Sequence, residues 1–115
     1  MAALRASVRV LGRSFLPQRA RAYNCAATNE KARLILGIET SCDDTGAAVV
    51  TTDGRILGEA IAGQVEVHAP WGGVVPSLAK EAHQAAIDRV VADALSAAGV
   101  SACDLDAVAD RKSVV

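Results

Sequence analysis

Hydroxyl and carboxyl side chains crowd together directly after an apolar run in this sequence. The run Leu34–Ile38 ends in the polar segment 39–45, which has the sequence Glu-Thr-Ser-Cys-Asp-Asp-Thr. Hydroxyls and backbone N–H groups in such a turn can bind phosphate oxygens, whereas adjacent carboxylates repel phosphate. Asp43 and Asp44 therefore suit a metal, an oriented water or hydroxyl, or a general base. The spacing alone leaves open an Asx-turn, in which the aspartates only accept hydrogen bonds from the backbone.

An α/β architecture is predicted to position this acidic segment. The apolar run suits a strand over about 33–39 that is covered on both faces. Residues 47–52 predict a second strand, Asp53-Gly54 a two-residue hairpin turn, and residues 55–61 the returning strand. These three strands should form an antiparallel meander. Because α/β proteins bind ligands where strands run into loops, chemistry is expected at residues 39–45.

A long helix is expected to pack on this sheet. Residues 64–76, with Gly72-Gly73 and two prolines, predict a loop before it. Ser77 is a suitable N-cap and Gly99 a suitable end, which predicts a helix from Ser77 to Ala98. At 100° per residue its apolar stripe consists of His83, Ile87, Val90, Ala94 and Ala98. His83 is then either a hydrogen-bonded core residue or a residue at the site edge that orients the acidic segment. Residues 104–109 approach a fourth strand, which the charges of residues 110–113 should interrupt.

The first 29 residues differ in composition from the rest. They contain five arginines and no acid, whereas residues 30–115 carry seven bases and all thirteen acids, a formal charge of −6. In a helix, Arg5, Arg9 and Arg13 would flank an apolar face of Leu4, Val8, Leu11 and Phe15. This pattern is typical of a mitochondrial transit peptide, and a basic nucleic-acid-binding arm is the alternative. Its apolar runs are too short for a secretory signal or a membrane span.

Cysteine usage and charge exclude several protein classes. Cys25, Cys42 and Cys103 form no Cys-x-x-Cys pair, which argues against a zinc ribbon or a disulfide framework and fits a reducing compartment. No basic neighbour supports a nucleophilic role for Cys42. The acidity of the part after the leader argues against a DNA-coating protein, and its length allows one domain at most.

The segment 36–45, with the sequence LGIETSCDDT, closely resembles the opening signature of the universal tRNA threonylcarbamoyladenosine transferase family. The blocks QVEVH at 64–68 and GGVVP at 72–76, followed by Ala79 and His83, have the family's order and spacing. A weaker block is LDAVA at 105–109. The resemblance covers roughly residues 33–109, and the leader resembles that of the mitochondrial branch. Ser77 departs from the glutamate that bacterial members usually carry there.

The resemblance implies an actin-like (ASKHA), two-lobed ATPase fold, with residues 33–109 as the N-terminal part of the first lobe. It implies transfer of threonylcarbamoyl from threonylcarbamoyl-AMP to the adenosine beside the anticodon in tRNAs that read codons starting with A. Asp43 and Asp44 would then be catalytic, orienting the amine and removing its proton. The implied substrate- or nucleotide-binding residues are Thr40, Ser41, Thr45 and His83. The implied partners are tRNA and, for a full-length protein, a second copy; the implied location is the mitochondrial matrix.

Other family features have no counterpart in this sequence. The His-x-x-x-His pair that binds the family's divalent metal, the Gly-rich phosphate loop and the second lobe are missing, and residues 110–115 do not match. We therefore expect a truncated lobe without metal ligands, with uncovered apolar surface, that is inactive alone. The alternatives are an inactive short isoform that binds the full-length enzyme, and a kinase of the actin-like superfamily. No His-Glu-x-x-His helix supports a peptidase.

Overall fold

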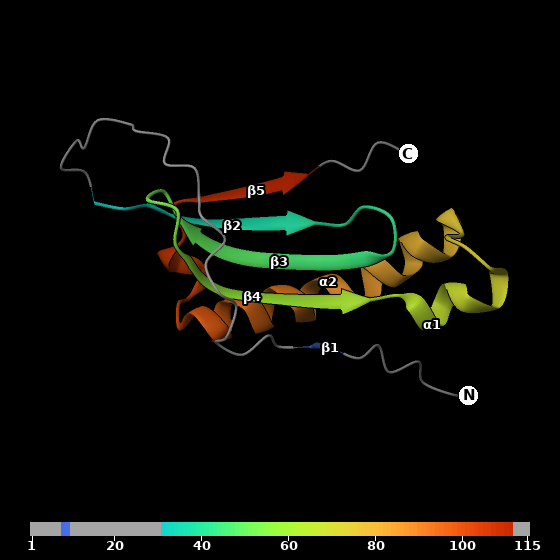
Figure 1. Cartoon of the computed structure of the whole chain (residues 1–115). Coiled ribbons are helices and arrows are strands. Elements are labelled where there is room, and N and C mark those ends of the chain that lie inside the picture. Colours follow the sequence, from blue (N-terminus) through green and yellow to red (C-terminus); the bar gives the residue numbers. More distant parts are fainter. Residues whose placement is uncertain (1–7, 10–30, 112–115) are drawn as a thin grey trace.

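Five strands form one sheet in the order β1-β4-β3-β2-β5 in the computed structural model, which describes residues 8–9 and 31–111 (Figure 1). Strands β2, β3 and β4 are antiparallel neighbours, β5 runs parallel to β2, and β1 pairs antiparallel with β4. The α/β class and the three-strand meander with a helix are confirmed. The strand bounds are β1 Val8–Arg9, β2 Leu34–Glu39, β3 Asp44–Thr51, β4 Ile56–Gly63 and β5 Ala107–Arg111.

The turn between β3 and β4 lies where Asp53-Gly54 predicts it, but it is longer than a two-residue hairpin. Residues 52–55 connect the strands, and Gly54 adopts a left-handed φ of 89°. The hydroxyl of Thr51 accepts a hydrogen bond from Arg55 N at 3.0 Å and donates one to the carboxylate of Asp53. The hydrogen bond from Thr51 holds the pKa of Asp53 below its ordinary value, with a further contribution from the Arg55 charge.

The long helix α2 spans Pro76–Ala98, close to the predicted range. Its N-cap is Val75 in an extended conformation and not Ser77, because Pro76 occupies the first helical position, where a missing N–H is harmless. Gly99 ends the helix as predicted, with a left-handed φ of 68°.

The segment predicted as a loop before α2 is partly helical. It contains α1, Val65–His68, and the 3-10 helix η1, Ala69–Trp71. The carbonyl of Gln64 accepts hydrogen bonds from the backbone N of Val67 at 2.9 Å and of His68 at 3.2 Å, which starts this turn. A second short 3-10 helix, η2 Ala102–Asp104, precedes β5.

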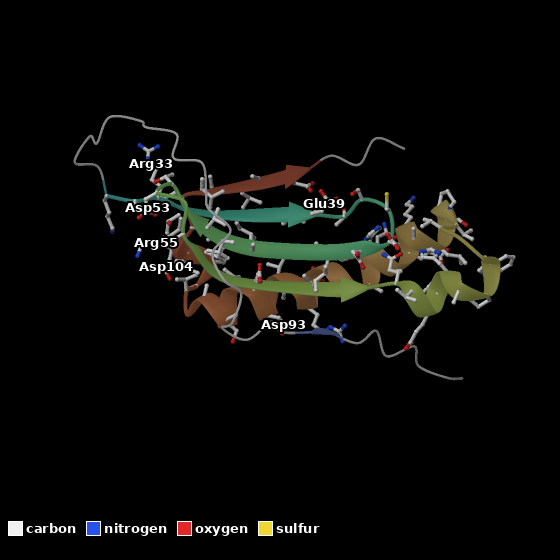
Figure 2. All side chains as sticks on the ribbon, in the orientation of Figure 1. Arg33, Glu39, Asp53, Arg55, Asp93 and Asp104 are labelled. Carbon is white, nitrogen blue, oxygen red and sulfur yellow. The ribbon has the colours of Figure 1, made fainter. Side chains whose placement is uncertain are left out.

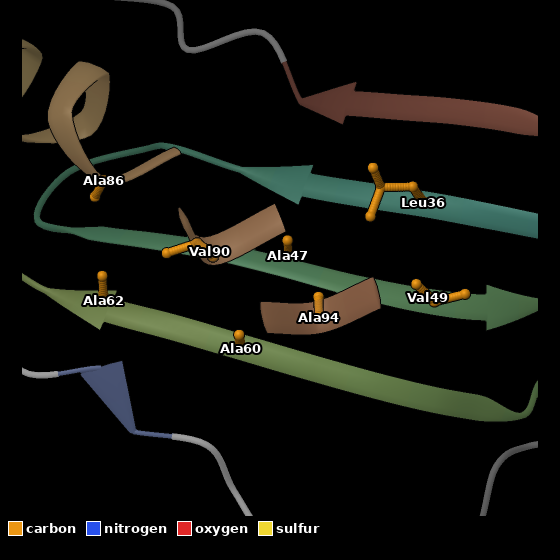
Figure 3. Packing of buried hydrophobic residues seen from close by; sticks show 8 residues of the cluster. All are labelled: Leu36, Ala47, Val49, Ala60, Ala62, Ala86, Val90 and Ala94. Carbon is orange, nitrogen blue, oxygen red and sulfur yellow. The ribbon is translucent and has the colours of Figure 1, made fainter. Parts of the chain in front are cut away.

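The core lies between α2 and one face of the sheet, which we call the covered face (Figure 3). Small residues let the helix approach the strands closely: an ideal Cβ at Gly58 of β4 would lie 2.3 Å from the backbone N of Ala98. The buried helix residues are Ala79, Ala86, Val90 and Ala94. The predicted stripe was wrong in detail, because Ala86 is buried whereas His83, Ile87 and Ala98 are half-buried.

Three further predictions differ from the structure. Strand β2 was expected to be covered on both faces, yet among the described residues its helix cover comes from α2 on one face (Figure 1). Strand β5 continues through Asp110 to Arg111, because an edge strand tolerates an exposed charged side chain such as that of Asp110. Val8 and Arg9 form a strand paired with Ile61 and Ala62, not a helix. The rest of the leader and residues 112–115 lie outside the described residues.

Candidate functional site

The acidic loop, residues 40–43, joins β2 to β3 at the end of the sheet opposite the Asp53 turn (Figure 2). Its first bend is held by Glu39, whose carboxylate accepts a hydrogen bond from the backbone N of Ser41 at 2.7 Å. Cys42 has a φ of 56°, a left-handed conformation that costs a non-glycine residue about 1–2 kcal/mol. The loop is therefore a defined turn whose conformation depends on contacts around it.

The sequence-predicted site residues do not all face the same side of the sheet. Thr40, Ser41 and Asp43 are half-buried in the loop or at its end, and Asp44 is exposed as the first residue of β3. Because strand side chains alternate, Asp44 projects from the open face, the face opposite α2, and Thr45 projects towards α2. The structure therefore separates Asp44 from Thr45, although they are adjacent in sequence.

Thr45 and His83 lie together on the covered face. Thr45 is fully buried, and its hydroxyl lies 2.7 Å from Nδ1 of His83. Nε2 of His83 donates a hydrogen bond to the carbonyl of Cys42 at 3.3 Å. His83 thus links helix α2 both to the start of β3 and to the left-handed residue of the acidic loop. A direct substrate contact by Thr45 or His83 stays a prediction.

Two polar residues that sequence reasoning did not assign complete this arrangement. Gln64, at the end of β4, places its amide N 3.0 Å from Nδ1 of His83 and its amide O 2.9 Å from Nε2 of His68. The backbone N of Gln64 donates to the carbonyl of Asp43 at 2.9 Å. Both Gln64 and His68 are buried, so His68 is not a surface residue. The signal that could have identified them was their shared presence in the QVEVH block.

A groove of about 610 Å³ crosses the open face of the sheet. Its lining is largely apolar and small, with Gly37, Gly46 and Ala48 among its residues, and it also includes the acids Glu39, Glu59 and Asp110. Glu39 lines the groove and directly precedes the acidic loop, so the groove extends to the start of this loop. The groove and the Gln64 contacts lie on opposite faces of the sheet, so the loop is the element that connects them.

The described residues do not fit a divalent metal. Within residues 8–9 and 31–111, no three His, Cys, Asp or Glu side chains gather closely enough to hold an ion. Asp43 and Asp44 are adjacent in sequence but belong to the loop and to the strand start, and Asp44 projects from the open face. Within the same ranges no helix has the length and apolarity required to cross a bilayer.

Comparison with known proteins gives consistent matches. Residues 55–110, which contain β4, α2 and most of β5, match the family model described as tRNA N6-adenosine threonylcarbamoyltransferase. The rat and human proteins named "tRNA N6-adenosine threonylcarbamoyltransferase, mitochondrial" are each 57% identical over 77 residues, which is 67% of this chain and 19% of the relative. A Sorangium cellulosum protein of the same name without "mitochondrial" is 57% identical over 75 residues, 65% of this chain and 21% of the relative. The chain thus spans about a fifth of the length of these relatives.

Proposed function

Because the chain belongs to the tRNA N6-adenosine threonylcarbamoyltransferase family, a family of transferases, we propose that it contributes to threonylcarbamoylation of tRNA. The substrates are threonylcarbamoyl-AMP and the adenosine beside the anticodon in tRNAs that read codons starting with A. The proposed location is the mitochondrial matrix. The names of the rat, human and zebrafish relatives and the arginine-rich, acid-free leader support this location.

The acidic loop carries the proposal for the chemistry. In the reaction, the exocyclic amine attacks the carbamoyl carbon, a C–N bond forms, the C–O bond to AMP breaks, and the amine loses a proton. Asp44 is the better placed carboxylate to orient the amine and accept that proton, because it is exposed on the open face beside the acidic loop. Asp43 is the alternative. Thr40 and Ser41 would face the phosphate side, where hydroxyl and backbone N–H donors can stabilise charge.

Thr45 and His83 act in this proposal on the position of the acidic loop. Their mutual hydrogen bond and the bond from His83 to the Cys42 carbonyl fix the turn from which Asp44 emerges. Precise placement of a reacting group can contribute several kcal/mol to an acyl transfer, so a positioning role is compatible with a large effect on rate.

In this proposal the reaction takes place between the two lobes of the family's actin-like fold, and residues 33–109 supply the start of one lobe. We therefore expect the purified chain alone to form no product. The test incubates it with threonylcarbamoyl-AMP and unmodified tRNA, beside a chimera in which residues 33–109 replace the matching segment of the rat relative. The chimera should modify tRNA, and Asp44→Asn should lower its kcat by about a hundredfold or more.

The matched control in the chimera is Asp53→Asn, which removes an exposed aspartate at the other end of the sheet. It should leave kcat within about twofold of the parent. Unchanged activity of both Asp44→Asn and Asp43→Asn chimeras would remove the acidic loop from the mechanism. Product formed by the unmodified chain would instead show that this segment suffices.

The open face favours a second candidate function, that of a short partner that docks on a full-length enzyme. Ile56 and Ile61 are exposed on the sheet, and the apolar groove crosses its open face. Co-purification with the full-length protein, together with a lack of activity alone, would favour this role. Elution of the two proteins as separate species at micromolar concentration would reject it.

A further inference from the structure

We infer that Gln64 is a positioning residue whose side-chain amide, oriented by His68, sets the tautomer of His83 and so couples the acidic loop to the segment that precedes α2. Five groups form a hydrogen-bonded chain, from the backbone N of Val75 through His68, Gln64 and His83 to the carbonyl of Cys42. These hydrogen bonds are independent of any activity, whereas their effect on the reaction rate rests on the proposed function.

The hydrogen bond from Val75 fixes the tautomer of His68. The backbone N of Val75 lies 3.2 Å from Nδ1 of His68 and can only donate, so Nδ1 must carry no hydrogen. The neutral ring then carries its hydrogen on Nε2, which donates to the amide oxygen of Gln64 at 2.9 Å. A backbone donor at one end thus determines which way the Gln64 amide is oriented.

The second part passes this direction on to His83. With its oxygen towards His68, the amide of Gln64 presents its NH₂ group to Nδ1 of His83 at 3.0 Å. That nitrogen must accept, so the hydrogen of the neutral ring is on Nε2, which donates to the Cys42 carbonyl at 3.3 Å. The hydroxyl of Thr45 lies 2.7 Å from the same Nδ1, and because a hydroxyl can donate or accept, it is compatible with this tautomer without fixing it. In all four hydrogen bonds from Val75 to Cys42, the donor therefore lies on the Val75 side and the acceptor on the Cys42 side.

Burial makes this direction costly to reverse. Gln64, His68 and Thr45 are at most 5% exposed, and every buried side-chain N or O atom among the described residues has a hydrogen-bond partner. An amide turned the wrong way would face donor to donor and acceptor to acceptor at a site where Gln64 and His68 are buried and His83 is half-buried. Gln64 also holds Asp43 through its backbone N. One residue therefore contacts the loop directly and through His83.

Glutamate at position 64 tests the inference, because it keeps the shape and replaces the NH₂ donor by an acceptor oxygen. In imidazole ¹H–¹⁵N correlation spectra of the full chain, both histidines of the parent should carry hydrogen on Nε2 and none on Nδ1. In Gln64→Glu, Nδ1 of His83 should carry a hydrogen, and the backbone amide signals of Cys42 and Asp43 should shift. The matched control is Gln84→Glu, the same change at an exposed position of α2, which should alter neither ring.

Two results would overturn the inference: hydrogen on Nδ1 of His83 in the parent, or a folded Gln64→Glu variant with unchanged imidazole signals. If Gln64→Glu does not fold, Thr45→Val provides the second measurement: it removes the hydroxyl beside Nδ1 and should leave the tautomer of His83 intact, whereas a changed tautomer would show that Thr45 and not Gln64 sets it. In the chimera, Gln64→Glu should lower kcat about tenfold or more with KM nearly constant, whereas Gln84→Glu should change neither. An inactive parent chimera would reject the proposed function and leave the tautomer result standing.

Discussion

The covered and open faces of the sheet are built from similar small residues, yet only the covered face is closely packed. On the covered face, Gly58 has α2 backbone within 2.3 Å of the position a Cβ would take. On the open face, the nearest atom to a Cβ on Gly46 would be 4.0 Å away. Small residues therefore have different consequences on the two faces. On the covered face they allow α2 to approach the strands, and on the open face they leave room for the groove.

The largest difference between the faces is expected for alanine substitution of glycine. Gly58→Ala should destabilise the fold by about 3 kcal/mol or more, because the new methyl group meets helix backbone that cannot rotate away. Gly46→Ala should change stability by less than about 1 kcal/mol. Urea unfolding followed by circular dichroism measures both, and equal losses would remove the distinction between the faces.

A smaller contrast is expected for large-to-small changes. Val90 is fully buried under the sheet, so Val90→Ala should cost about 2–3 kcal/mol through lost burial and a cavity. Ile61 is 38% exposed and lines the groove, so Ile61→Ala should cost less than about 1.5 kcal/mol although it removes more atoms. Thermal unfolding of the two variants compares them. A larger loss for Ile61→Ala would indicate that something covers the open face in solution.

The acidic loop joins the two faces, and a glycine at position 42 should relieve the backbone strain of its left-handed residue. Cys42→Gly is expected to raise stability by about 0.5–1 kcal/mol, because glycine adopts the left-handed φ of 56° without a steric cost. Cys42→Ala serves as the control, since alanine keeps the cost and removes the thiol. The free energies of unfolding from urea titrations should differ between these two variants. No difference would mean that position 42 is not strained in solution.

The smallest effect is expected at the far end of the sheet, where Thr51 holds the pKa of Asp53 below its ordinary value of 3.8. A lowered folded-state pKa stabilises the fold above the unfolded value, and this contribution is lost as pH falls through the folded value. The advantage of the parent over Asp53→Asn should therefore be constant near neutral pH and shrink below pH 3.8. Urea midpoints measured from pH 7 downwards check this, with Asp88→Asn as the control for charge. An advantage that grows on acidification would contradict the assignment.

Local patterns in the sequence predicted the meander, the long helix and its glycine end, because each depends on a few adjacent residues. Helix α2 begins at Pro76, one residue before the predicted start. Val75 is the last extended residue and serves as the N-cap in place of Ser77. Helix α1 was missed because its neighbours include Gly72, Gly73 and Pro70, which predict a loop. Strand β5 was expected to stop at its charges, but only one of its edges is paired in the described sheet.

The location of the candidate site was predictable, but its division between two faces was not recognised. Period-two alternation alone separates Asp44 from Thr45, so this could have been deduced once β3 was known to begin at Asp44. The role of Gln64 could not, since it depends on where β4, α1 and α2 meet in space. Buried polar side chains are identified by their partners, which a single sequence does not pair.

The parallel pairing of β5 with β2 has a kinetic consequence. The β3–β4 hairpin closes across four residues, whereas the bond from Leu34 N to the Asp106 carboxylate spans 72 residues. Closing the longer segment costs about 2.5 kcal/mol more in chain entropy, so β5 should dock after the hairpin and α2 have formed. Strand β2, which leads into the acidic turn, would then gain its second neighbour in the last step of folding.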